Sequence, residues 1–272
     1  MTHTIRIPVD VTNPGQFFAC CGLLEVASRC YGDVSARFVR DEFELVGCPI
    51  GTSPNDLIRQ LLEAPEFKPP MTKELALNGS KSKLLPVMIT LGERSTIRLD
   101  WWRDESRSPH KESVNETCAP SAFKTWTANQ SPQQILYDRL LPALRRFIKD
   151  EVQSLLWERV QLTGRFGLEP TAASVALDVG WSPDSLEVPV ASSPAIELLA
   201  AIGLQRFRPE LDSQNRRVCR YRAWTIPLPL SVAPAACVGA LVGVPARTYR
   251  FRIAERGDYK YFAHAVPEGD TP

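Results

Sequence analysis

The sequence has little of the material from which most catalytic and metal sites are built. Its 272 residues include only three histidines, His3, His110 and His264, and its seven cysteines form no CxxC pair. No histidine stands at a metal-ligand spacing from a cysteine, so the common zinc sites are not indicated. We therefore expect reduced, mostly buried thiols, no metal ion and no cofactor.

Long apolar runs are also missing. The longest, around residues 226–244, is interrupted by prolines and falls short of the roughly 18 apolar residues that a membrane span needs. The opening residues, MTHTIRIPVDV, do not place a basic segment ahead of a long apolar one, which is the pattern of a signal peptide. We therefore expect a cytoplasmic protein without a membrane partner.

Known catalytic patterns are absent as well. The sequence has no GxSxG elbow, no HExxH pair and no glycine-rich phosphate loop after a strand. Neighbouring acids such as Asp41 and Glu42 stand in an expected turn, where solvated charge is the simpler interpretation. We expect a protein that is not an enzyme. A metal-dependent nuclease with scattered acidic ligands remains an alternative.

Composition and periodicity indicate an α+β fold, with antiparallel sheets covered by helices. A hydrophobic fraction of 44% and a charged fraction of 23% are ordinary for a globular protein. A polar, turn-rich segment at 103–121 predicts a long loop. Strands are expected at 4–11, 35–40, 42–47, within 83–99, and at 186–190, 221–230 and 248–253, and helices at 14–31, 54–64, 131–158, 194–204 and 234–242.

The first expected helix has well-defined ends. Asn13 is a good N-cap, Pro14 suits the first helical position, and Gly32 is a plausible C-cap. Cys20 and Cys21 lie about seven residues into this helix, past the first turn where the helix dipole would activate a thiol. Because the helix is apolar almost all round, we interpret both cysteines as core residues.

Two segments of the chain resemble one another. IPVDVTNPGQFFACCGLLEV and VPVASSPAIELLAAIGLQRF share a strand, a turn with proline and an apolar helix, and 14 residues separate Pro8 from Gly22 and Pro189 from Gly203. Any two strand–turn–helix units could look alike, so coincidence is one interpretation. The other is two related α/β halves. The chain would then form two domains at 1–150 and 151–272, or a single domain.

Positive charge is concentrated towards the C-terminus. The formal net charge is +1, yet residues 205–260 carry ten arginines and one lysine against four acids. Two clusters, at 216–224 and 247–261, interleave arginines with aromatics, and strand alternation predicts Arg220, Arg222 and Trp224 on one face. Guanidinium groups neutralise phosphates and aromatic rings stack on unpaired bases. A solvated, salt-bridged sheet face is the alternative.

Two further segments are weaker candidates for binding. FKTWTANQSPQQ, at 123–134, precedes a capped helix, although Trp126 could equally fill the core, and GRFG projects one arginine from a tight turn. The predicted nucleic-acid-binding residues are Arg216, Arg217, Arg220, Tyr221, Arg222, Trp224, Arg247, Arg250, Arg252, Tyr259 and Lys260, with Lys124, Trp126 and Arg165 as second choices.

Several blocks, taken in order, carry a family resemblance. They are IPVDVTNPGQFFACCGLLEVASR, FKTWTANQSPQQI, GRFGLEPTAASVALDVGWSPDSLEV, PAIELLAAIGLQRFRP, YRAWTIPLPLSVAPA and RFRIAERGDYKYFAHAVP. Together they resemble the CRISPR-associated accessory proteins of the Csb/Csx group from type I-U (type I-G) systems. The resemblance spans nearly the whole chain.

That resemblance implies a subunit of an RNA-guided DNA interference complex in antiviral defence. Its partners would be guide RNA, target DNA and other subunits of the effector complex, with sequence read by guide pairing. Many sister subunits are built from ferredoxin-like modules with a glycine-rich C-terminal loop, so the resemblance implies two ferredoxin-like halves. The only candidate for the loop is Gly239 to Gly243, which we expect inside an apolar helix. The alternative is a protein–protein adaptor of the same complex that contacts no nucleic acid.

Overall fold

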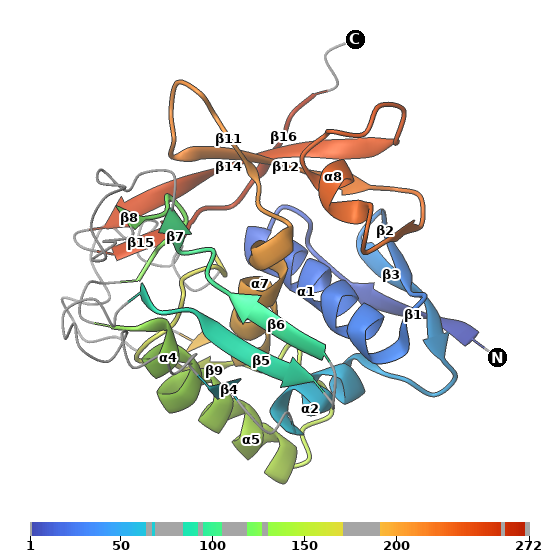
Figure 1. The fold of residues 1–272 in the computed structure, drawn as a ribbon, viewed down its shortest axis with the longest axis vertical. Coiled ribbons are helices and arrows are strands. Elements are labelled where there is room, and N and C mark those ends of the chain that lie inside the picture. The colour runs from blue at the N-terminus through green and yellow to red at the C-terminus, as the bar shows by residue number, and fades with distance from the viewer. Residues whose placement is uncertain are drawn as a thin grey trace, which may run out of the picture.

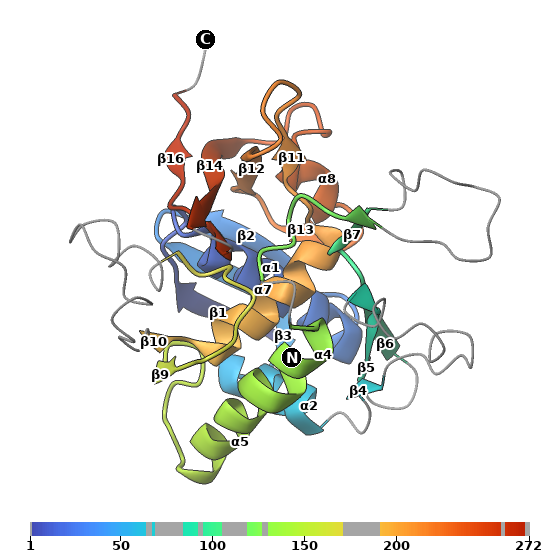
Figure 2. The same ribbon diagram turned by 90° about the vertical axis from the view of Figure 1, so that its left-hand side faces the viewer.

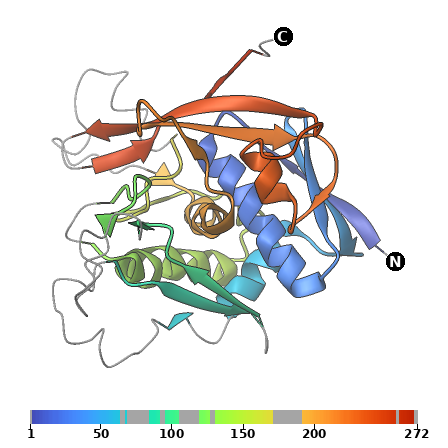
Figure 3. The same cartoon turned by 45° about the horizontal axis from the view of Figure 1, so that its top comes forward.

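The computed structural model describes residues 2–63, 67–68, 84–91, 95–104, 119–126, 130–170, 191–256 and 259–269. Helices and antiparallel sheets are mixed along these ranges, so the predicted α+β class is confirmed. Figures 1 and 3 show α1 and α7 in the middle, with the sheet of β12 and β14 on one side and α5 with β5 and β6 on the other. No described helix is long and apolar enough to cross a bilayer.

The N-terminal sheet packs against the first helix. Its strands are β1 (Thr2–Pro8), β2 (Ser35–Val39), β3 (Glu42–Pro49) and β13 (Leu228–Pro229), in the order β1-β3-β2-β13. Helix α1 (Pro14–Tyr31) begins where predicted, because the Asn13 side chain accepts a hydrogen bond from the backbone N–H of Gln16. It ends at the predicted Gly32, whose φ of 85° lies in the left-handed region.

A second sheet contains most of the predicted basic clusters. Strands β11 (Glu210–Leu211), β12 (Val218–Trp224), β14 (Ala246–Arg256) and β15 (Tyr259–Phe262) pair in that order, and β16 (Val266–Pro267) adds to β14. Helix α8 (Ala233–Cys237) lies against β12. Figure 2 shows β16 running beside β14 towards the C-terminus.

The remaining described elements are the central helix α7 and the elements that stand between the two sheets in the sequence. The chain between the two sheets forms α2 (Pro54–Glu63), β4 (Phe67–Lys68), β5 (Val87–Leu91), β6 (Ser95–Leu99), β7 (Arg103–Asp104), β8 (Ala119–Pro120), α4 (Pro132–Gln134), a π-helical stretch (Ile135–Leu140), α5 (Leu141–Lys149), β9 (Val160–Gln161), β10 (Ala191–Ser192) and α7 (Pro194–Arg206).

Helices α1 and α7 cross at two glycines. A Cβ added to Gly22 would lie 2.0 Å from the carbonyl oxygen of Leu199, and one added to Gly203 would lie 2.0 Å from that of Phe18. Phe18 and Leu199 each stand one turn before the glycine of their own helix, so the crossing has local two-fold symmetry. The two glycines are the ones that the internal similarity aligns, which supports the interpretation of related segments.

The two predicted halves share one hydrophobic core. A single cluster of buried residues contains side chains from both sides of residue 150. Ferredoxin-like halves are not confirmed: β1-α1-β2-β3-α2 follows the order of a β-α-β-β-α-β unit, but β4 pairs with β5 in a separate sheet. The proposed boundary at 150 therefore stays a prediction.

Some predicted element bounds were wrong. The helix expected to continue to residue 158 ends at Lys149, and Asp150 caps it outside the helical region. The helix expected at 234–242 ends at Cys237, and Gly239 and Gly243 both have positive φ. The strand expected at 221–230 divides into β12 and β13. The strand expected at 186–190 and most of the loop expected at 103–121 lie outside the described residues.

Candidate nucleic-acid interface

Four of the predicted arginines share the outward face of one strand pair. Arg220 and Arg222 project from β12, and Arg250 and Arg252 project from β14, with the residues between them buried. The antiparallel register places Arg220 directly opposite Arg250, and Arg222 opposite Thr248. The strand register thus gathers into one surface charges that stand some 30 residues apart in the sequence.

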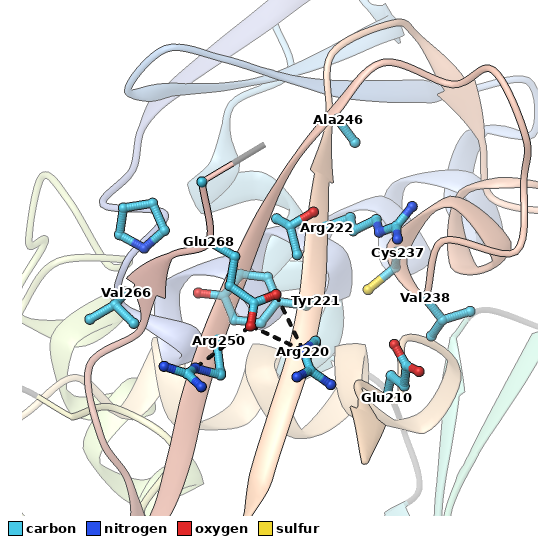
Figure 4. A pocket seen from close by; sticks show the side chains of 13 residues that line it. Glu210, Arg220, Tyr221, Arg222, Cys237, Val238, Ala246, Arg250, Val266 and Glu268 are labelled. Atoms are coloured by element: carbon cyan, nitrogen blue, oxygen red, sulfur yellow. Dashed lines mark hydrogen bonds and ion pairs between the residues drawn. The ribbon is translucent and has the colours of Figure 1, made fainter. Parts of the chain in front are cut away.

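A carboxylate lies between the two opposed arginines. Arg220 Nε lies 3.0 Å from Oε1 and 3.2 Å from Oε2 of Glu268, and Arg250 Nε lies 3.6 Å from Oε1 (Figure 4). Like charges directly opposite one another destabilise a β-ladder, so the carboxylate offsets a repulsion built into the register. The hydrogen bond to Glu268 is the main cause that raises the pKa of Arg220 above its ordinary value.

Strand β16 brings Glu268 to this face. Val266 pairs with Arg250 and Pro267 with Tyr249, and the Glu268 backbone N–H donates to the Thr248 carbonyl at 2.9 Å. The Glu268 side chain then reaches across β14 towards β12 (Figure 4). Together these strands and α8 outline a groove of about 830 Å³, whose charged lining residues are Glu210, Arg220, Arg222, Arg250 and Glu268.

Arg220 and Arg222 differ in their partners. Arg220 Nη1 also lies 3.2 Å from Asp212 Oδ2. The pKa of Asp212 is lowered mainly by hydrogen bonds from the backbone N–H groups of Asn215 and Gln214. Arg222 is exposed, and no described carboxylate lies within ion-pair distance of it. A Cβ at Gly239 would lie 2.3 Å from Arg222 Cζ, so the missing side chain gives the guanidinium its place over the turn after α8.

The aromatic half of the prediction was wrong for Tyr221 and Trp224. Both are fully buried, so neither can stack on a base. The Tyr221 hydroxyl donates to the Val11 carbonyl at 2.6 Å, and Trp224 Nε1 donates to the Ala36 carbonyl at 2.6 Å. Trp224 is not exposed beside Arg222, because Phe17, Phe38 and Phe207 pack around its ring.

Other predicted basic residues lie outside the groove. Arg217 and Lys260 both pair with Glu255, at 2.8 and 3.6 Å. Arg216 lies 3.6 Å from Asp104 in a separate hollow of about 560 Å³. A further predicted residue, Arg247, donates to the Arg40 carbonyl at 2.6 Å, while its Nε is buried and has no partner. The side chain of Tyr259, on β15, is outside the described part of the structure.

Trp126 is a core residue, as the alternative interpretation had it. Its ring packs edge-on against Trp101 and Phe166, with centroids 5.8 and 5.3 Å apart, and only 4% of it is exposed. Lys124 lies over this ring and donates to the Trp126 carbonyl at 2.7 Å. Neither residue joins the arginine face, and the prediction of Trp126 as a binding residue was wrong.

Arg165 belongs to a buried acidic site that the sequence analysis missed. Glu197 on α7 is fully buried, and its carboxylate accepts hydrogen bonds from the backbone N–H groups of Gly167, Leu168 and Glu169 at 3.0, 3.0 and 3.1 Å. Burial raises the pKa of Glu197 to about 7, while the half-buried Arg165 acts in the opposite direction. That Arg165 also binds nucleic acid stays a prediction.

The cysteines behave as predicted for core residues. Cys20 and Cys21 are buried, and burial raises the pKa of both thiols. Burial also raises the pKa of Cys219 and of Cys237 to about 12, so these thiols stay protonated. Among the described residues, no group of three or more His, Cys, Asp or Glu side chains is arranged to hold a metal ion.

Comparison with known proteins adds no relative. No family model, no curated protein and no solved structure matches the chain. Function is therefore inferred from the geometry of the arginine face. The sequence analysis missed Glu268, because nothing in PEGD indicates which strands its carboxylate would bridge.

Proposed function

We propose that the protein is a non-catalytic nucleic-acid-binding subunit that holds the sugar–phosphate backbone on the outward face of β12 and β14. One observation carries the proposal: four arginines project from two adjacent strands onto the same face, with Arg220 and Arg250 in direct register. Their spacing follows the strands, so it suits a repeating polyanion better than a single small anion.

The buried aromatics sharpen what this surface would recognise. Since Tyr221 and Trp224 lie in the core, these two rings would add no stacking on unpaired bases to the binding affinity. Affinity would come from phosphate contacts, which position a strand but carry no sequence information. This matches the role that the Csb/Csx resemblance implies, in which guide RNA pairing with target DNA supplies the sequence reading.

The test is a binding titration at two salt concentrations. Wild-type protein would be titrated against labelled single-stranded RNA, single-stranded DNA and duplex DNA. The proposal expects affinity to fall steeply with salt, and Arg222→Glu to weaken binding at least about tenfold, because one favourable phosphate contact becomes a repulsion. Arg145→Glu is the matched control: Arg145 is exposed on α5, so the charge change is the same on another surface. Equal losses in both variants would contradict the proposal.

A protein–protein adaptor is the second candidate. It is favoured by Val242, which is fully exposed in the loop that starts at Gly239, the glycine that lies against the Arg222 guanidinium. Arginine is enriched at protein–protein interfaces, so exposed arginines near an exposed apolar side chain would also suit a partner protein. In that case nucleic acid would not bind at low salt, and Val242→Asp, but not Arg222→Glu, would abolish capture of the effector subunits.

A further inference from the structure

Glu268 occupies the position on the arginine face that an external anion would need. Its carboxylate lies between the Nε atoms of Arg220 and Arg250, and no other described acid contacts both. A phosphodiester presents two non-bridging oxygens to guanidinium groups much as a carboxylate does. Within the groove, therefore, the chain supplies its own substitute for a phosphate.

The pairing is of a kind that exchanges readily. The side chains of Glu268, Arg220 and Arg250 are 28%, 33% and 51% exposed. Ion pairs this open to water are weak and screened by salt, so a competing anion can displace one partner. Glu268 therefore contrasts with the buried acids of the molecule.

Displacement needs only a side-chain rotation. The backbone of β16 is held by its pairing with Tyr249 and Arg250 and by the hydrogen bond from Glu268 N–H to Thr248. None of these bonds involves the Glu268 carboxylate. The groove wall would thus stay in place while the carboxylate turns away.

We propose that Arg220 and Arg250 form a binding site for a backbone phosphodiester of nucleic acid, and that Glu268 occupies this site when nucleic acid is absent. This inference rests on the proposed function. It adds that Glu268 is a built-in competitor which lowers the affinity of the resting protein and discourages binding to scattered polyanions. The two opposed arginines then have an anionic partner in both states.

The experiment compares two glutamine variants of the full chain. Glu268→Gln removes the competing charge, and Glu255→Gln is the matched control. Glu255 also bridges two cations, Arg217 and Lys260, but it stands an odd number of residues from Arg250 on β14 and lies outside the groove. Both variants lose one negative charge. Affinity for a labelled 24-nucleotide single strand, as RNA and as DNA, would be measured across a salt series.

We expect Glu268→Gln to bind about three- to tenfold more tightly than wild type, with a salt slope steeper by about one. Adding Arg220→Gln and Arg250→Gln to Glu268→Gln should abolish this gain. Thermal unfolding of each variant should match wild type, which separates a change in binding from a change in folding.

Other outcomes would overturn the inference in different ways. If wild type binds, Arg222→Glu weakens it and Glu268→Gln equals wild type, the phosphate site is wrong and the proposed function stands. If Glu255→Gln tightens binding as much as Glu268→Gln, only net charge matters and the site is again wrong. If neither wild type nor Glu268→Gln binds, both the site and the proposed function are overturned.

Discussion

Glu197 and Glu268 are both carboxylates held by several donors, yet their surroundings are opposite. Glu197 is fully buried and bonded by three backbone N–H groups that cannot move without the fold. Glu268 is partly exposed and held by two arginine side chains on a sheet surface. The donors, more than the carboxylate, decide whether such a site is permanent or exchangeable.

Glu25 lies between these two cases. Its side chain is 3% exposed and accepts hydrogen bonds from Arg29 and Arg206, at 2.6 and 2.7 Å. The two arginine side chains are themselves partly exposed. It therefore combines the burial of Glu197 with the guanidinium donors of Glu268. Because Arg206 belongs to α7, this pair also links the two central helices. The three glutamates form a series in which stability effects should decrease as donors become more exposed.

The largest loss in the free energy of unfolding is expected for Glu197, the most buried of the three sites. Glu197→Ala leaves three buried backbone N–H groups without an acceptor, and we expect it to lower the free energy of unfolding by about 3 to 5 kcal/mol. Urea denaturation followed by circular dichroism measures this. Glu210→Ala, at an exposed glutamate, is the control, and equal losses at both positions would break the comparison.

The next effect is a pH dependence carried by Glu197. Burial raises its pKa from the ordinary 4.5 to about 7, so the folded state holds a proton that the unfolded state releases within this window. Stability from this group is complete below pH 4.5 and is lost as pH rises through 7, by up to roughly 3 kcal/mol. Urea midpoints at pH 4.5 to 8 should fall more steeply for wild type than for Glu197→Gln. Parallel curves would contradict the assignment.

An intermediate effect is expected at Glu25. Glu25→Gln removes the charge that both Arg29 and Arg206 bind, while it keeps the side-chain volume. We expect a loss of about 1 to 2 kcal/mol in the free energy of unfolding, because two charged hydrogen bonds are weakened. The loss stays moderate since the partly exposed arginines regain contact with water. Thermal or urea unfolding would show it. A loss as large as that of Glu197→Ala would show that the type of donor does not set the order.

The smallest effect on stability is expected at Glu268. Glu268→Gln should change the free energy of unfolding by less than about 0.5 kcal/mol, because its ion pairs are exposed. The same urea titration measures it. A loss above about 2 kcal/mol would mean that this contact holds the sheet together, and that it could not yield to a phosphate without unfolding β16.

Local signals in the sequence predicted much of the fold. Asn13 with Pro14, Gly32, the hairpin of β2 and β3, and the cap Ser131 act over a few residues, so the sequence suffices to recognise them. The long helix expected after Ser131 was the main error. After one short α-helical turn, Ile135–Leu140 adopt a π-helical stretch, and the chain turns at Glu151, which has a φ of 52°.

The candidate site could not be predicted fully from the sequence, because it depends on tertiary contacts that no local pattern contains. Alternation correctly separated Arg220 and Arg222 from Tyr221, but it could not show that the aromatic face would be covered by α1. It failed at Trp224, where other elements bury both faces of the strand end. The opposition of Arg220 and Arg250 follows from register, and the position of Glu268 follows from β16 joining β14, both of which are tertiary facts.

The glycine crossing of α1 and α7 has a consequence for how the protein is made. The Arg206–Glu25 and Gly22–Leu199 contacts join residues about 180 positions apart, so α1 emerges from the ribosome long before its partner exists. At about 5 to 20 residues per second, that interval lasts roughly 10 to 40 s. Throughout it, a helix that is apolar on every side must be shielded by the nascent N-terminal sheet or by chaperones. The core around α1 can therefore be completed only after α7 has been synthesised.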